Sequence, residues 1–598
     1  MNFRTAWAQR HRMVILLWAA LITLPWWLPR LGSYTALGSK ILIYGLATMG
    51  LNLLFGFTGG LSFGQAAYFG IGAYGAGMTL KYISPSTPLA IVIGTLAGGL
   101  AATILGPLVM RRRGIYFAMI TIAIGQLFYF VAVRWNNVTG GEDGLAGFQR
   151  QPIHVGAFTY DLDQTRFYYL VLFCFAIGVI ILRTLLRSPL GHTWVAIREN
   201  RRRMEFLGIR TDLYVWASFA IAGLITALAG TLSALLFNFT SPQDLHWILS
   251  GNFVMMIVLG GMRSFWGPLL GTAIFVYAQD YLSSITNNWM TFIGLIFVGI
   301  VLLFPKGLLG MVGRATGFGL KPRMPQEPAF PPPVSGGALD TEVAERRRGG
   351  ELLRLDHVSR QFGALRAVDD VSFAMAPGEL RAVIGQNGAG KTTFFNLISG
   401  FHAPTSGEIW FRGEDIRRCT VVARVARGIV RTFQITEIFP DLTVFESIQV
   451  AVEAASGVTR LPWVSPSTRE ALDRRVADVM DDTDLTSKAD RIVGELAHGD
   501  QRAVEIAMAL SMNPRLLLLD EPTAGMSDAE TEHMVGLIRR LHKEHGLSIL
   551  FIEHDMDIVF DIAERITVLD HGRTIAEGLP DEISVNRRVR AAYLGEAA

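Results

Sequence analysis

Long apolar runs fill the first half of the chain. Between residue 1 and about residue 310, about ten stretches come close to the ~20 residues that a helix needs to cross a bilayer. The first half is therefore predicted to be an α-helical polytopic membrane domain. We expect its spans at residues 13–31, 39–57, 61–80, 88–110, 114–134, 167–185, 213–237, 249–265, 267–284 and 290–307.

The pattern changes after Leu352. Short apolar stretches, such as Leu380–Ile384, alternate there with helical segments, which is typical of an α/β domain. Residues 314–350, between the two halves, are rich in proline, glycine and arginine and show no periodicity, so we expect a linker there. The predicted organisation is a membrane domain over residues 1–313, this linker, and an α/β domain over residues 351–598.

Composition agrees with a large membrane-embedded part. Of the 598 residues, 51% are hydrophobic and only 18% are charged. The formal net charge of +3 is small for such a long chain and argues against a nucleic-acid partner. The two cysteines, Cys174 and Cys419, supply neither a disulfide framework nor a pair with metal-ligand spacing.

Basic residues indicate the orientation of the predicted spans. Arginines cluster within residues 4–12, 111–113 and 183–210. Cytoplasmic loops carry an excess of Lys and Arg, and with about ten spans all three clusters fall on the side of the N-terminus. The C-terminal domain follows on the same side, so we expect it in the cytoplasm.

A glycine-rich stretch follows the apolar run Leu380–Ile384 and precedes a predicted helix. This strand–loop–helix context is that of a phosphate-binding P-loop, in which backbone N–H groups and the helix N-terminus surround phosphate oxygens. We expect Lys391 to reach the β- and γ-phosphates of ATP and Thr392 to hold Mg²⁺. The alternative is a glycine turn that binds nothing. The expected ATP-binding residues are Gly385, Gln386, Asn387, Gly388, Ala389, Gly390, Lys391, Thr392 and Thr393.

Polar residues follow two further apolar stretches. Four leucines precede Asp520 and Glu521, so we expect a buried strand whose end enters the ligand crevice. Asp520 would hold Mg²⁺ and Glu521 would polarise the attacking water, although a solvated acidic turn is the plain alternative. His554 is a candidate for contact with the γ-phosphate and Gln434 for sensing Mg²⁺ and water; each is a weak signal on its own.

The glycine-rich run from Gly56 to Gly77 in the membrane half has two interpretations. Small residues let membrane helices pack closely. Alternatively, polar Ser62 and Gln65 line a substrate path at a broken helix, because irregular backbone is tolerated within a membrane where it faces a cavity. The predicted external loop, about residues 135–166, contains Thr139–Gly144, which is either a plain turn or a docking site or gate.

A basic and partly apolar segment lies on the predicted cytoplasmic side, from Pro189 to Ile209. The preference for basic cytoplasmic loops would by itself explain its arginines. The mixture of apolar and basic positions also suits a short helix that docks in a groove of a cytoplasmic partner. The candidate coupling residues are Trp194, Ile197, Arg198, Glu199, Asn200 and Gly208.

Taken in order, the motifs of the second half resemble those of an ABC-transporter ATPase. They are the P-loop, Gln434, Leu496–Arg502, Asp520-Glu521, Ala524–Asp528 and His554. The resemblance implies ATP hydrolysis with Mg²⁺, adenine stacking on Phe362, and a head-to-tail dimer of two such domains. It also implies a signature motif that acts on the ATP of the other domain, formed by Leu496, Ala497, His498, Gly499, Asp500 and Gln501.

A closer resemblance is to the bacterial branched-chain (hydrophobic) amino acid importers. In the ATPase half, it rests on Thr432–Ile435 and Phe439–Glu446. In the membrane half, it rests on Phe55–Gly70, Arg113–Met119, Thr139–Gly141, Ala196–Asn200 and Gly260–Gly267. The chain thus looks like a natural fusion of one permease and one ATP-binding subunit, which are usually separate polypeptides.

The signature departs from the family pattern. It usually begins Leu-Ser-Gly-Gly-Gln, whereas Ala497, His498 and Asp500 stand here at the second, third and fifth positions. Ala497 has no hydroxyl for a γ-phosphate, although the N–H of Gly499 and the helix N-terminus could still donate. We expect the composite site that uses this signature to be the weaker of two.

The resemblance implies a multi-pass importer subunit in the bacterial cytoplasmic membrane. It would work with a second related permease, a second ABC ATPase or a second copy of this chain, an external substrate-binding protein and membrane lipid. Urea or short amides are an alternative cargo. An ABC exporter or lipid flippase is a further alternative, but exporter halves typically carry about six long spans, unlike the short-looped spans here.

Overall fold

The computed structural model describes residues 3–110, 112–155, 158–304, 307–310 and 350–594. They divide into two compact units. The first unit consists of the described residues of Met1–Arg198 and Asp212–Gln326, and the second of those of Glu199–Thr211 and Glu327–Ala598. The predicted linker, residues 314–350, lies outside the described residues except for Gly350.

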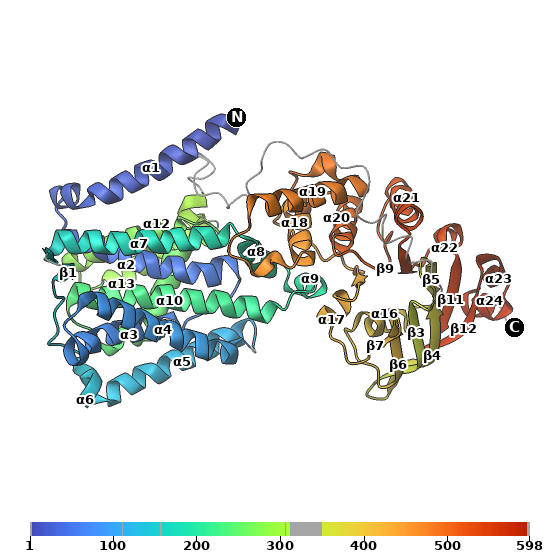
Figure 1. The fold of residues 1–598 in the computed structure, drawn as a ribbon, viewed down its shortest axis with the longest axis horizontal. Helices are drawn as coiled ribbons and strands as arrows, with labels where there is room; N and C mark the ends of the chain where they lie inside the picture. The colour runs from blue at the N-terminus through green and yellow to red at the C-terminus, as the bar shows by residue number, and fades with distance from the viewer. Residues whose placement is uncertain (1–2, 111, 156–157, 305–306, 311–349, 595–598) are drawn as a thin grey trace. The chain divides into compact units, whose positions relative to one another are not determined.

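The first unit is built from helices (Figure 1). Each of the predicted spans overlaps one of its described helices. Six described helices are long and apolar enough to cross a membrane: α2 with the turn that follows it, α4, α5, α7, α10 and the helix that begins at Trp289. The remaining predicted spans overlap α1, α3, α11 and α12, which are not among these six helices. The helices are α1 (Phe3–Trp27), α2 (Thr35–Asn52), α3 (Gln65–Met78), α4 (Thr87–Val109), α5 (Ile115–Arg134), α7 (Gln164–Leu186), α8 (Pro189–Glu199), α10 (Thr211–Phe237), α11 (Trp247–Gly260), α12 (Gly267–Ile285) and α13 (Trp289–Leu303).

A break separates α2 from α3. A π-helical turn, Leu53–Phe57, extends α2, and the chain is then non-helical until α3 begins at Gln65. Neighbouring helices satisfy freed backbone groups: Phe63 N donates to Thr121 Oγ1 at 3.1 Å and Ala66 N to Ser250 Oγ at 2.8 Å. Irregular backbone inside a membrane protein requires such partners.

Glycines bring α3 and α10 into close contact. A methyl group on Gly72 would lie 2.2 Å from the carbonyl oxygen of Ala227, and one on Gly230 would lie 1.8 Å from that of Phe69. Small residues permit this approach of two membrane helices. The close-packing interpretation of the glycine-rich run therefore applies at Gly72.

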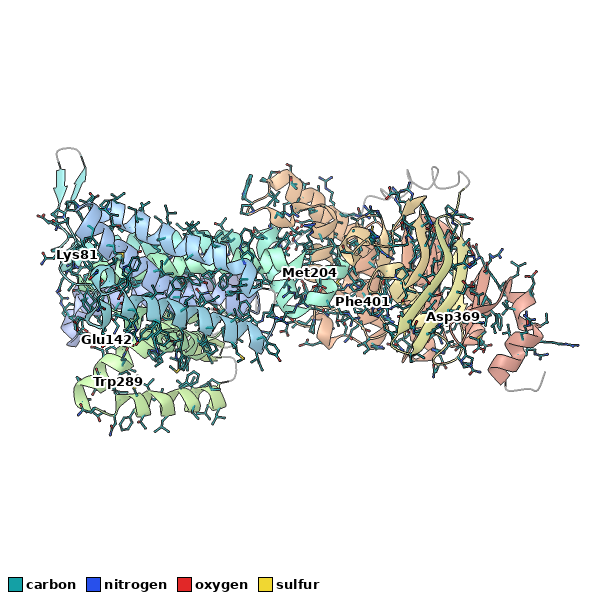
Figure 2. The ribbon with its side chains drawn as sticks, turned by 90° about the horizontal axis from the view of Figure 1, so that it is seen from below. Lys81, Glu142, Met204, Trp289, Asp369 and Phe401 are labelled. Carbon is teal, nitrogen blue, oxygen red and sulfur yellow. The ribbon has the colours of Figure 1, made fainter. Side chains whose placement is uncertain are left out.

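The segment predicted to be an external loop carries a short helix, α6 (Asn136–Thr139), and a hairpin of β1 (Ile153–Val155) and β2 (Phe158–Tyr160). Lys81, just beyond α3, donates to the carbonyl of Ala146 at 2.9 Å. Lys81 and Glu142 lie toward the same end of the first unit in Figure 2. The loop is thus held against the helical ends of its own unit.

Two sheets form the centre of the second unit. The six-stranded sheet has the order β12-β11-β5-β10-β9-β8 and is parallel except for β12, and the four-stranded antiparallel sheet has the order β4-β3-β6-β7 (Figure 1). The strands are β3 (Leu353–Phe362), β4 (Leu365–Met375), β5 (Leu380–Ile384), β6 (Ser406–Phe411), β7 (Glu414–Asp415), β8 (Ile429–Arg431), β9 (Leu516–Asp520), β10 (Ser548–Ile552), β11 (Arg565–Asp570) and β12 (Arg573–Gly578).

Helices cover both faces of the six-stranded sheet. Leu517 and Leu519 of β9 pack in one core cluster with Ile538 of α21, whereas Leu516 and Leu518 pack in a second cluster with residues of α16. A strand buried on both faces needs a continuous apolar run, which explains the four consecutive leucines. The helices of this unit are α9 (Arg201–Phe206), α16 (Lys391–Ser399), α17 (Val421–Val425), α18 (Val444–Ala455), α19 (Pro466–Asp482), α20 (His498–Leu510), α21 (Asp528–His545), α22 (Met556–Ile562), α23 (Pro580–Ser584) and α24 (Arg587–Leu594).

The substitution Gly230→Ala tests the contact between α3 and α10. Its added methyl group meets backbone rather than a flexible side chain, so we expect a destabilisation of about 1–3 kcal/mol and a lower melting temperature of the full chain in detergent. Gly251→Ala in α11 is the matched control, because nothing lies within 4 Å of the added methyl group. Equal melting temperatures for the two variants would contradict this packing.

Candidate active site

The carboxyl ends of four parallel strands bring the predicted motifs together. β5, β10, β9 and β8 are neighbours in this order and run parallel. The P-loop follows β5, His554 follows β10, Glu521 follows β9 and Gln434 follows β8. Ligands of open parallel sheets bind at this edge.

The P-loop has the conformation that its glycines permit. Gly390 precedes α16 with φ of 96°, and a methyl group there would lie 2.2 Å from the carbonyl oxygen of Ala367. Lys391 Nζ donates to the carbonyl oxygens of Gly385 and, at 3.0 Å, Gln386. The lysine therefore folds back over the loop.

The lysine also lies within electrostatic reach of both predicted carboxylates. Burial lowers the pKa of Lys391, while the charges of Glu521 and Asp520 act in the opposite direction. Thr392, in the first turn of α16, is exposed. The P-loop and the carboxylates at the end of β9 thus form one site.

Glu521 is contacted by the two weaker candidates. Its Oε1 accepts from Gln434 Nε2 at 3.0 Å and lies 3.1 Å from His554 Nε2. Glu521 has φ of 48°, a left-handed conformation that is costly for a residue with a side chain and that clusters at functional sites. Gln434 and His554 are therefore each within hydrogen-bonding distance of the Glu521 carboxylate.

Asp520 forms a buried ion pair that sequence reasoning missed. Arg431 Nη2 lies 2.7 Å from Asp520 Oδ2, and the two side chains are 4% and 2% exposed. The other oxygen, Oδ1, is buried without a hydrogen-bond partner among the described residues. An unpartnered carboxylate oxygen at this position fits a metal-bound water.

A second unpredicted residue, Glu553, fixes the loop after Glu521. Its Oε1 accepts from the backbone N of Thr523 at 2.9 Å and from the hydroxyl of the same residue at 2.5 Å. Its Oε2 accepts from the backbone N of His554 at 3.1 Å. Glu553 thereby ties the segments that follow β9 and β10 to each other.

The signature lies at the start of α20. Ala497 is the residue before the helix and makes no side-chain capping bond, and α20 begins at His498. The N–H of Gly499, which sequence reasoning left free for phosphate, donates to Glu530 Oε1 at 3.3 Å. A carboxylate thus lies beside a helix N-terminus that would otherwise favour phosphate.

The other signature residues make local contacts. Gln501 Nε2 donates to the carbonyl of Leu496 at 3.0 Å, and Asp500 accepts from Lys488 Nζ at 2.5 Å. Both contacts hold the first turn of α20 to the chain that precedes it.

Phe362 is the last residue of β3, in the antiparallel sheet. Its ring is 38% exposed. The Arg360 guanidinium lies 4.6 Å from its centre and the His402 ring 5.2 Å. Its expected role in adenine stacking remains a prediction, and the exposed ring is compatible with it.

The two halves of the chain match different known protein families. Residues 34–304 match the permease component of the branched-chain amino acid transport system. Residues 368–524 match the ABC transporter family, and residues 573–598 match the branched-chain amino acid ATP-binding cassette transporter.

Individual relatives cover the second half. The chain is 38% identical over 252 residues to the high-affinity branched-chain amino acid transport ATP-binding protein BraF of Pseudomonas aeruginosa, which covers 41% of this chain and 98% of BraF. It is 40% identical over 252 residues to LivG of Escherichia coli, which carries the same description, with the same coverage. A solved nucleotide-free ATP-binding cassette from an ABC transporter is 28% identical, with 41% of this chain and 100% of that chain covered and a TM-score of 0.37.

The chain belongs to the branched-chain amino acid ABC transporters. A single polypeptide of this family carries here both a permease domain and an ABC ATPase domain. The ATPase domain couples ATP hydrolysis to transport.

The candidate coupling residues of this transporter divide between the two units. In the first unit, Trp194 Nε1 donates to the Tyr214 carbonyl at 2.7 Å, Ile197 is buried and Arg198 donates to the Gly56 carbonyl. Glu199 is the last residue of α8.

Asn200 and Gly208 belong to the second unit. Asn200 donates to Glu437 Oε2 at 2.5 Å, and a methyl group on Gly208 would lie 3.3 Å from Val425. Residues 199–211 are therefore packed into the ATPase domain of the transporter, where Met204 is fully buried (Figure 2).

The candidates for the substrate path are buried in the first unit of the transporter. Ser62 Oγ accepts from Gly64 N at 3.3 Å. Gln65 is 0% exposed, and neither atom of its amide has a hydrogen-bond partner among the described residues. An unsatisfied buried amide is costly and is typical of a site that a water or ligand completes.

The substitution Arg431→Met tests the buried ion pair of the ATPase domain. It leaves the Asp520 carboxylate buried and unpaired, which costs about 3–5 kcal/mol, so we expect a clearly lower melting temperature of the full chain. Adding Asp520→Asn should restore part of the loss. Arg417→Met, which removes an exposed arginine paired with Asp415 at 2.6 Å, should have no measurable effect because water screens that pair. A melting temperature unchanged by Arg431→Met would contradict the assignment.

Proposed function

We propose that this chain is the fused permease and ATPase subunit of an importer for branched-chain or other hydrophobic amino acids in the bacterial cytoplasmic membrane. The observation that carries the proposal is the convergence of Gln434 and His554 on Glu521 beside the P-loop. The names of the relatives BraF and LivG support the substrate class. The matched permease family, rather than an exporter family, supports the direction of transport.

Hydrolysis would use the residues at the shared strand edge. ATP would lie on the P-loop with Lys391 on the β- and γ-phosphates, and Glu521 would accept a proton from the attacking water. Gln434 and His554 would hold the Glu521 carboxylate and the water in line with the γ-phosphate. Phe362 would stack on the adenine.

Magnesium would be held by Thr392, Gln434 and Asp520. Two observations support this site: Asp520 Oδ1 is buried without a hydrogen-bond partner in the part of the chain that the structure describes, and the side chain of Thr392 is exposed. Mg²⁺ is usually bound by one or two protein groups together with phosphate oxygens, where it neutralises charge that develops on the phosphates.

The working transporter would contain further subunits. We propose a second related permease, a second ABC ATPase or a second copy of this chain, and an external binding protein that delivers the amino acid. About ten membrane spans would place the N-terminus and the ATPase domain in the cytoplasm. Thr139–Gly144 would then face the binding protein, and Ser62 and Gln65 would line the substrate path.

The two ATP sites of such a complex would be unequal. Ala497 supplies no hydroxyl to a phosphate, and the N–H of Gly499 already donates a hydrogen bond to the Glu530 carboxylate. A carboxylate repels the γ-phosphate of an ATP held by the other ATPase domain. The composite site with this signature would therefore be the weaker one.

Uptake of labelled leucine by cells that lack their own branched-chain transporter tests the function. We expect uptake with the full set of subunits, and none with Glu521→Gln, whose ATPase activity should fall by at least about 100-fold while ATP still binds. Normal hydrolysis by Glu521→Gln would exclude this residue as the catalytic carboxylate. Uptake of urea or acetamide without leucine would instead support the alternative cargo, and thermal-shift screening of the binding protein gives an independent answer.

The ranking of the two ATP sites is tested in a complex with a distinct second ATPase. Lys391→Ala disables the P-loop of the stronger site, so we expect ATPase activity to fall by at least about tenfold. Ala497→Glu disables the weaker composite site and should leave most of the activity. Equal losses would show that the two sites are equivalent.

A further inference from the structure

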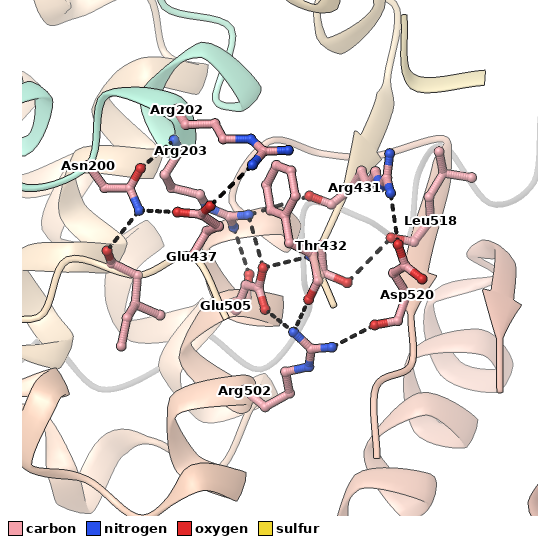
Figure 3. A network of polar contacts seen from close by, with 12 residues as sticks. Asn200, Arg202, Arg203, Arg431, Thr432, Glu437, Arg502, Glu505, Leu518 and Asp520 are labelled. Carbon is pink, nitrogen blue, oxygen red and sulfur yellow. Dashed lines mark hydrogen bonds and ion pairs between the residues drawn. The ribbon is translucent and has the colours of Figure 1, made fainter. Parts of the chain in front are cut away.

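One arginine from residues 199–211, Arg203, is fully buried in the second unit. The side chains of Arg203 and Glu505 are both 0% exposed, with Arg203 Nη1 3.6 Å from Glu505 Oε1. Arg203 Nη2 also donates to the Glu505 carbonyl at 2.9 Å, and Nη1 donates to the Arg431 carbonyl at 3.4 Å (Figure 3). Neither Arg203 nor Glu505 belongs to the motifs that bind ATP.

Glu505 joins this arginine to the active site. Its Oε1 accepts from the backbone N of Phe433 at 2.9 Å, and its Oε2 accepts from Arg502 Nη1 at 2.7 Å (Figure 3). Burial raises the pKa of Glu505, and Arg502 and Arg203 oppose that shift. Both arginines thus favour the charged form of this buried carboxylate.

Arg502 carries the connection to the catalytic carboxylates. Its Nη2 donates to the carbonyl of Asp520 at 2.6 Å and to that of Glu521 at 2.9 Å, and its Nη1 donates to the carbonyl of Phe433. Phe433 is the residue before Gln434. The backbone on either side of the Gln434–Glu521 contact is therefore held by Arg502, whose position Glu505 fixes.

Further contacts anchor the segment that supplies Arg203. The ring of Phe206 lies edge-on to that of Phe433, with 4.5 Å between their centres. The Arg202 guanidinium lies 5.0 Å from the ring centres of both Phe433 and Phe401, within the range of a cation–π contact. Asn200 accepts from the backbone N of Arg203 at 2.9 Å and so caps α9.

We infer that Arg203 is a positioning residue for ATP hydrolysis: docked residues 199–211 complete the Arg203–Glu505–Arg502 network, and this network sets the backbone that carries Gln434 and Glu521. The inference rests on the proposed function, because it regulates the same hydrolytic site. Movement of this segment would remove the positive charge of Arg203 from the buried network. Glu505 would then keep only Arg502 as a charged partner among the described residues, and an incompletely paired buried charge is costly. The rate of hydrolysis thereby depends on the position of Arg203 in the docked segment.

The test measures ATPase kinetics and ATP binding of the full chain in its complex. Arg203→Met should lower kcat by about 10- to 100-fold, because a small displacement of catalytic groups is enough for such a loss, while KM and the Kd for ATP change by less than about twofold. Arg203→Lys keeps the charge but loses the planar fork that reaches two carbonyls, so its kcat should lie between those of wild type and Arg203→Met.

Arg201→Met is the matched control. Arg201 lies on the same helix and carries the same charge, but its guanidinium donates to Thr211 at 2.9 Å and lies 3.8 Å from Glu205, both within the segment. It should keep the wild-type kcat. Adding Glu505→Gln to Arg203→Met should cost less than the sum of the two single changes, because both remove parts of one network.

The outcomes separate this inference from the proposed function. A wild-type kcat for Arg203→Met, or a loss that appears wholly in KM, overturns the positioning role and leaves the proposed function intact. If Arg203→Met does not fold, the kcat of Arg203→Lys decides, and a value equal to wild type overturns the role. A wild-type complex that hydrolyses no ATP contradicts the proposed function itself, and the inference then falls with it.

Discussion

The parallel register of β5, β10, β9 and β8 is the constraint on which the ATPase domain depends. Both faces of the sheet are covered by helices, so the middle of each of these strands is apolar, and the polar residues of the site stand where the strands end. Since the four strands run in one direction, those residues gather at one edge. The P-loop, Glu521, His554 and Gln434 are neighbours for this reason, although 163 positions of the sequence (391 to 554) separate Lys391 from His554.

Buried charged side chains fix the backbone that carries the residues at this edge of the sheet. Arg431, Arg502 and Arg203 lie among two carboxylates, Asp520 and Glu505, in an interior where water cannot screen them. Each charge there requires its partners, because an unpaired buried ion is far more costly than a broken surface pair. The network therefore resists small adjustments, which gives the site its fixed geometry and links that geometry to the presence of residues 199–211.

The first unit is held together in a different way. Membrane helices gain little from burying apolar side chains, so close backbone approach and buried hydrogen bonds have to supply the contacts. Gly72 and Gly230 permit that approach between α3 and α10, while Thr121 and Ser250 satisfy the backbone at the break before α3. Gln65 differs from Thr121 and Ser250, because neither polar atom of its buried amide has a hydrogen-bond partner among the described residues.

The sequence by itself determined the elements and the chemistry of the ATP site. Apolar runs located the membrane helices, and the spacing of the P-loop and of Asp520-Glu521 identified the nucleotide motifs, because hydrophobic period and motif spacing are local properties. Only the tertiary structure decided which charges are partners. Arg203 and the Glu505 carbonyl are 302 positions apart, and the usual excess of cytoplasmic arginines was already a sufficient explanation for Arg203. The one local signal was Glu505 itself, an acidic residue within the otherwise apolar stretch of α20; its partner depends on how distant segments pack, which no local pattern encodes.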